Sequence, residues 1–168
     1  MSTRSRGARR YIRQALEYLR DAKRKEARGA RGTRMPAERL RHTLMGERDG
    51  RASGFHHRPN GVDPAGAKLI RVTKRDERTG VYEGQVAIAN RRNGEWHLKQ
   101  KSTFFPDDWT PEQVDNAVDR AFREGAVKDP RTGRWQSTFR GIVLEGFYDP
   151  DTDTLRHGYP VLGPRRTA

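Results

Sequence analysis

The pattern of apolar and polar positions begins with an amphipathic helix. From Tyr11 to about Ala27, apolar residues recur every three or four positions, and basic residues occupy the opposite face. Residues 1–10 lack such a face and are expected to be disordered, whereas the glycine-containing run at residues 29–33 is expected to be a linker. The first part of the chain is therefore predicted to be one helix followed by a connection.

Two further helices are predicted from the signals at their ends. Pro36 suits a first helical position, two leucines follow one turn apart, and Gly46 stops the segment. The later helix spans residues 111–124, where an N-cap threonine, a first-turn proline and a capping-box glutamine precede an apolar face. Between the two, residues 47–66 hold too many glycines and prolines for regular structure, so we predict a loop.

The remaining segments have the pattern of short strands joined by turns. Runs rich in β-branched and aromatic residues are separated by turns that contain glycine, proline or aspartate. The predicted strands are residues 68–74, 81–89, 96–105, 134–139, 142–148 and 155–161. The fold class is therefore α+β, with helices early, one meander, a crossing helix and a second meander.

Charge divides the chain into two parts. The net charge is +13, and residues 1–35 alone carry 12 arginines and lysines against three acidic residues. We therefore expect a basic helical extension over residues 1–35 and a single domain over residues 36–168. A basic chain favours polyanionic partners, with nucleic acid first and an acidic membrane or acidic protein second. The extension could grip RNA, dock onto a larger assembly, or present an ordinary solvated face.

Composition excludes several kinds of segment and site. The sequence has no run of 18 apolar residues, which predicts no membrane-spanning helix, and its basic start lacks the apolar core of a secretory signal. It has no cysteine, so disulfides and thiolate metal sites are excluded and the compartment stays open. We expect a soluble chain.

The candidate chemistry lies in the histidines around the predicted loop. His42 falls near the end of a short helix, and His56 and His57 lie on the loop that follows. Cleavage of RNA without a metal or other cofactor needs a base, an acid and a fixed cation. Histidine can be the acid or the base near neutral pH, and a lysine can be the cation.

The third predicted strand supplies lysine candidates. Strand alternation turns Trp96 and Leu98 toward the core and leaves the polar residues on the other face. That polar face consists of His97, Lys99, Lys101 and Thr103. It could bind a ligand or be an ordinary solvated strand face.

Other functions remain open on these residues. A non-catalytic RNA-binding module needs only the basic helix, and the His56-His57 pair with Asn60 suggests a metal-dependent DNase of the His-Asn-His type. The sequence has no phosphate-binding loop of the NTPase kind and no serine or cysteine nucleophile motif. Tyr159 could stack on a base, hydrogen-bond to it, or simply pack in the last strand.

Three motifs resemble a known family. Residues 42–47 (HTLMGE) and 53–56 (SGFH) resemble the two-histidine signature of the EndoU endoribonucleases, including its animal members. Residues 102–109 (STFFPDDW) are similar to the STFFP-x-x-W block of bacterial EndoU toxins, and residues 159–160 to the terminal Tyr-Pro. The motifs occur in the family's order between residues 40 and 162.

The resemblance implies a fold and a reaction. The fold would have two small antiparallel sheets with flanking helices, as in the barnase, colicin and RelE group, and the extension would add a basic helix. The reaction would cleave single-stranded RNA, with tRNA among the possible targets, 3′ of uridine without a metal and leave a 2′,3′-cyclic phosphate. His56 would be the base and His42 the acid. Lys99 would be the catalytic lysine, with Lys101 as the alternative.

The same resemblance assigns substrate contacts and partners. Thr103 and Tyr159 would hold the uracil and the ribose. The other positions assigned to substrate binding are Gly54, His57, Lys101, Ser102 and His157. His157 replaces a threonine of the family motif, which leaves the uridine preference open and adds an ionisable group. Bacterial relatives imply a toxin that acts in the cytoplasm after delivery by a secretion system or a phage, with an immunity protein as partner.

Overall fold

The computed structural model describes residues 3–29, 35–49 and 51–163 and has the α+β fold that the sequence predicts. Two antiparallel sheets have the strand orders β1-β2-β3 and β4-β5-β6-β7. The helices are α1 (Thr3–Ala27), α2 (Ala37–Met45) and α3 (Pro111–Arg123), with a 3₁₀ turn at Pro59–Gly61. The strands are β1 (Ala67–Arg75), β2 (Tyr82–Ala89), β3 (Trp96–Phe104), β4 (Val127–Asp129), β5 (Arg134–Phe139), β6 (Ile142–Asp149) and β7 (Thr154–Val161).

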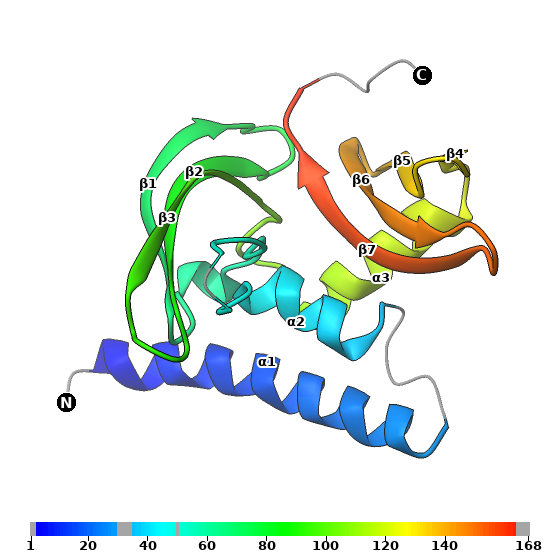
Figure 1. Ribbon diagram of the computed structural model, residues 1–168. Helices are drawn as coiled ribbons and strands as arrows, with labels where there is room; N and C mark the ends of the chain where they lie inside the picture. The colour runs from blue at the N-terminus through cyan, green and yellow to red at the C-terminus, as the bar shows by residue number, and fades with distance from the viewer. Residues whose placement is uncertain (1–2, 30–34, 50, 164–168) are drawn as a thin grey trace.

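The two sheets lie side by side and meet where β3 comes close to β7 (Figure 1). α3 covers one face of the second sheet, and α1 runs beneath α2 (Figure 1). The larger apolar core joins the helices to the second sheet around Trp135, while a smaller one lies under the first sheet around Phe55 and Phe104. The line along which β3 and β7 meet, called the seam below, therefore has a packed apolar core on each side.

The local end signals of α3 act as the sequence predicts. The hydroxyl of Thr110 accepts a hydrogen bond from the backbone N–H of Gln113, and the Gln113 side chain accepts one from the backbone N–H of Thr110. The apolar face of α3, which includes Val114 and Val118, is fully buried. The short strand β4 was not predicted, because its three residues form only the edge of the second sheet.

α1 is longer and more closely packed than its sequence suggests. The helix begins at Thr3, so the expected disorder of residues 1–10 is wrong for residues 3–10; their arginines are good helix formers and simply extend the helix. Ala15, Leu19 and Ala22 are buried. The Tyr18 hydroxyl also donates a hydrogen bond to Asp115 of α3. The predicted linker lies outside the described residues, apart from its first position.

Replacing Leu19 by alanine should test whether α1 is part of the folded domain. The side chain is 6% exposed within the main core, so we expect the free energy of unfolding to fall by about 2 to 5 kcal/mol. Urea denaturation measures this change. The matched variant Arg20→Ala removes an exposed neighbour and should change stability by no more than about 0.5 kcal/mol. Equal effects of the two variants would show that α1 is only loosely attached.

The faces of β3 are reversed relative to the sequence prediction. Trp96 and Leu98 are 48% and 51% exposed, whereas Lys99 lies opposite Val86, whose side chain is completely buried. Strict alternation cannot show which face is covered, and here the loop before β1 covers the side that carries Lys99. Phe55 of that loop packs with Val86 in the smaller core.

A register shift in β3 also separates the two candidate lysines. Val86 pairs with Lys99 and Gly84 with Ser102, so one residue of β2 faces two of β3. The prediction that Lys99, Lys101 and Thr103 share one face is therefore wrong.

Candidate active site

Three histidines and a tyrosine meet at the seam between the sheets. His42 lies in α2 and His56 in the following loop, while β7 contributes His157 and Tyr159. The His157 ring lies edge-on to His42 with ring centroids 4.9 Å apart, and its centroid is 6.3 Å from that of His56. His56 in turn stacks on Tyr159, with centroids 5.1 Å apart and an interplanar angle of 17°. Segments far apart in the sequence thus form one cluster.

His56 is held by its ring and by its backbone. Its Nδ1 lies 2.6 Å from the carbonyl oxygen of Thr103, which can only accept a hydrogen bond, so Nδ1 carries a proton. The remaining nitrogen, Nε2, then has a free lone pair. Burial lowers the pKa of His56 well below its ordinary value, and the nearby positive charge of Lys99 lowers this pKa further. His56 is therefore neutral at pH 7 and suited to accept a proton.

His42 has a negatively charged partner, whereas the partner of His56 is a neutral carbonyl. Its Nδ1 lies 3.2 Å from a carboxylate oxygen of Glu47, and such a carboxylate favours the protonated imidazolium. Burial lowers the pKa of His42, whereas the hydrogen bond and charge of Glu47 oppose that shift. The backbone N–H of Glu47 donates to the carbonyl of Ser53, which fixes this carboxylate beside the loop. The pKa of both histidines is lowered, that of His56 further, so His42 keeps its proton to a higher pH than His56 does.

Lys99 brings a cation to the same loop. Its Nζ donates hydrogen bonds to the carbonyl oxygen of Gly54 at 2.9 Å and to the hydroxyl of Ser102 at 3.2 Å. Burial lowers the pKa of Lys99 to about 8, so the ammonium is charged at neutral pH. Lys101 instead lies 3.6 Å from a carboxylate oxygen of Glu83, with its side chain 69% exposed.

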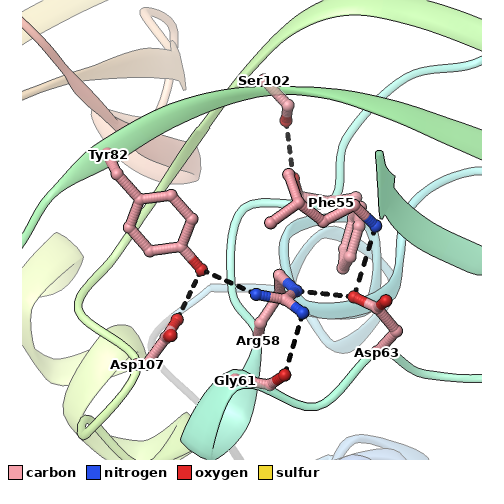
Figure 2. Close-up of polar contacts among 8 residues, drawn as sticks. Phe55, Arg58, Gly61, Asp63, Tyr82, Ser102 and Asp107 are labelled. Atoms are coloured by element: carbon pink, nitrogen blue, oxygen red, sulfur yellow. Dashed lines mark hydrogen bonds and ion pairs between the residues drawn. The ribbon is translucent and has the colours of Figure 1, made fainter. Parts of the chain in front are cut away.

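The loop that carries Gly54, Phe55 and His56 has a strained backbone. Gly54 has a φ of +73°, and a Cβ there would lie 2.4 Å from the carbonyl oxygen of His42, so only glycine fits. Phe55 has a φ of 69° although it is not glycine, and its side chain is completely buried. Ser102 donates a hydrogen bond to the carbonyl of Phe55 at 2.6 Å, which helps to hold this conformation (Figure 2).

A polar network anchors the far end of the same loop (Figure 2). Arg58 donates hydrogen bonds to the Asp63 carboxylate at 2.6 Å and to the Gly61 carbonyl at 2.8 Å. Its guanidinium also reaches the Tyr82 hydroxyl at 3.5 Å, and that hydroxyl donates to Asp107. The loop is therefore tied to β2 and to the segment after β3, which keeps His56 in place.

A known protein family matches most of the chain. A sequence model described as bacterial EndoU nuclease matches residues 36–162. The chain belongs to the bacterial EndoU nuclease family. The match begins just before α2 and ends with β7, so it includes the whole cluster and leaves α1 of this EndoU protein outside. No curated protein sequence and no solved structure matches the chain significantly.

Most of the residues predicted for the EndoU site lie in or beside the cluster. They are His42, Gly54, His56, Lys99, Ser102, Thr103, His157 and Tyr159. Two predicted residues lie elsewhere. His57 is completely buried, and its Nε2 is 2.8 Å from the carbonyl of Trp109; Lys101 is exposed beside Glu83. Burial lowers the pKa of His57 to about 4, so this ring is neutral.

The predicted substrate contacts of this EndoU nuclease already have protein partners. The Thr103 hydroxyl donates to the Pro160 carbonyl, which ties β3 to β7. The Tyr159 hydroxyl donates to Glu145 at 2.9 Å. Burial, together with nearby positive charges, lowers the pKa of His157 to about 3, so His157 is neutral.

Sequence reasoning missed the two carboxylates of the EndoU cluster. Glu47 was part of the matched motif but received no role, and its spacing of five residues from His42 was the available signal. Glu145 had no signal in the sequence, because its contact with Tyr159 depends on the pairing of β6 with β7.

Among the described residues, no group of three or more histidine, aspartate or glutamate side chains is placed so that it could hold a metal ion. None of the helices described is long and apolar enough to cross a membrane.

Proposed function

We propose that this EndoU nuclease is a metal-independent endoribonuclease. The observation that supports the proposal is the contrast between the two histidine partners: a neutral carbonyl at His56 and a carboxylate at His42. Environments that push two pKa values apart assign one group as base and the other as acid. The nearby Lys99 ammonium supplies the fixed cation.

The reaction we propose is an internal transfer on RNA. Nε2 of His56 takes the proton of a 2′-hydroxyl, whose oxygen then bonds to the adjacent phosphorus. The bond from phosphorus to the 5′-oxygen breaks, and Nε2 of His42 gives that oxygen a proton. Lys99 stabilises the negative charge that develops on the phosphate oxygens. The products are a 2′,3′-cyclic phosphate and a free 5′-hydroxyl.

We propose that the cleaved bond lies 3′ of uridine in single-stranded RNA. The Tyr159 ring stacks on His56, and because its side chain is only half-buried, the remaining ring surface is available to a base beside His56. The experiment is mass analysis of products from short RNAs that differ in one base, with EDTA present. The 2′,3′-cyclic phosphate should appear after uridine, and 2′-deoxyuridine at that position should block cleavage. RNA binding without any product would favour a non-catalytic binding module, and DNA cleavage that EDTA stops would favour a metal-dependent nuclease.

The pH dependence should follow the two histidines. His56 must be neutral and His42 protonated, so kcat/KM should peak between their pKa values, on the acid side of 6.5. Glu47→Gln removes the charge that raises the pKa of His42, so the alkaline limb should move to lower pH. Initial rates from about pH 4 to about pH 9 measure both limbs. An unchanged alkaline limb in Glu47→Gln would contradict the role of His42 as the acid.

We also propose that the enzyme acts as a toxin in the cytoplasm and that an immunity protein neutralises it. The support is membership of a bacterial nuclease family together with the net charge of +13, which suits an acidic inhibitor. Expression of the wild-type chain in bacteria should arrest growth, and the His56→Ala variant should not. Equal growth of both strains at equal protein levels would contradict the toxin role.

A further inference from the structure

A cavity lies between α3 and the turn that joins β5 to β6. Its volume is about 330 Å³, within the range of small-molecule sites. Two aromatic rings line it, those of Trp109 and Phe139, and lie at right angles with centroids 6.2 Å apart. Both residues also pack against the main core, so the rings form a rigid wall.

The rest of the wall is mostly polar, and three of its residues are arginines. Arg120, Arg123 and Arg140 line the cavity with a single carboxylate, that of Asp119. The guanidinium carbons of Arg120 and Arg140 lie 5.9 and 5.1 Å from the centre of the Phe139 ring. Such an arrangement of aromatic faces and guanidinium groups suits a nucleobase and its phosphate.

The arginines can exchange their present partners for a phosphate. Arg123 pairs with Asp119, whose side chain is 13% exposed, whereas Arg120 pairs with Glu124 just after the end of α3, and both of these side chains are at least half exposed. Exposed pairs of this kind contribute little to stability. For Arg140, no ion pair is found within the part of the chain that the structure describes.

The cavity is linked to the loop that carries His56. The carbonyl oxygen of Trp109 lies 2.8 Å from Nε2 of His57, the residue after His56. We infer that the cavity binds one nucleotide of the RNA strand outside the cleaved dinucleotide, with the base against Trp109 and Phe139 and the phosphate at the arginines. The inference rests on the proposed ribonuclease function.

The variant Arg140→Asn tests this second RNA site. Arg140 has a φ of 48°, a conformation that asparagine tolerates, so the turn should keep its shape. Two substrates are compared: the dinucleotide UpA, and a single-stranded RNA of about ten nucleotides with one uridine. We expect the ratio of kcat/KM for the longer RNA to that for UpA to fall about fivefold or more, through a rise in KM. Arg131→Asn, at the exposed turn between β4 and β5, is the matched control and should leave the ratio unchanged.

A direct binding measurement separates failure of this inference from failure of the proposed function. The probe is the same RNA with 2′-fluorouridine, which has no 2′-hydroxyl and cannot be cleaved. Arg140→Asn should weaken its binding about fivefold or more relative to Arg131→Asn, whether or not the wild-type chain cleaves RNA. Equal affinities of the two variants, or an unchanged substrate ratio, would overturn the inference. The inference would also be overturned if Arg140→Asn lost affinity for a protein partner but bound RNA as before.

Discussion

Replacing His56 by alanine is expected to reduce cleavage of a uridine-containing RNA by about 10²- to 10⁴-fold, the usual contribution of one positioned base. The side chain is only 6% exposed, and its Nδ1 is fixed by the Thr103 carbonyl, so no water can easily take its place with the same geometry. Initial rates with EDTA present measure the loss. Thermal unfolding of the variant shows whether the fold is intact. Full activity in a folded His56→Ala protein would contradict the mechanism.

A modified substrate distinguishes the base from the acid. In uridine 3′-(4-nitrophenyl phosphate), the leaving group departs without a proton, so the acid is no longer required. The loss caused by His42→Ala should therefore shrink on this substrate, whereas the loss caused by His56→Ala should persist. If both losses stay the same, the assignment of His42 as acid and His56 as base is wrong.

Replacing Lys99 by methionine is expected to reduce kcat by about 10²- to 10³-fold, with a smaller change in KM, because the charge is needed mainly in the transition state. Methionine keeps most of the length of the buried stem and removes the ammonium, which donates to the Gly54 carbonyl and the Ser102 hydroxyl. Steady-state kinetics on the same RNA measure both constants.

Lys101→Met is the matched control for Lys99. The two lysines lie two residues apart on β3, but the Lys101 side chain is exposed beside Glu83 and away from the histidines. We expect its effect on kcat to be at least tenfold smaller than that of Lys99→Met. A larger loss in Lys101→Met would show that the cation of the reaction comes from Lys101.

The candidate site was predictable where it depends on local sequence. His42 and His56 lie in short motifs whose spacing fixes them near a helix end and a glycine loop, and the structure brings the two together. The motif selects His56 over His57 as a catalytic residue, but it does not show where the His57 ring lies, because adjacent loop residues point in different directions. Its burial against Trp109 comes from a contact 52 residues away along the chain.

The sequence by itself determined the fold class, the ends of α3 and the residue types available for chemistry. These follow from periodicity, capping residues and turn residues, all of which act over a few positions. The α+β prediction with two meanders was correct for that reason, and the two small antiparallel sheets that the family resemblance implied were confirmed as well. The start of α1 was missed because a basic segment without an apolar face gives no periodic signal.

Only the tertiary structure decided which side of β3 is covered, which lysine reaches the loop and which partner each histidine has. The register shift opposite Gln85 and the packing of Phe55 beneath the sheet turn Lys99 inward. The Thr103 carbonyl meets His56 across 47 residues of chain. Such contacts depend on how separate elements pack, and no local pattern of residues records that packing.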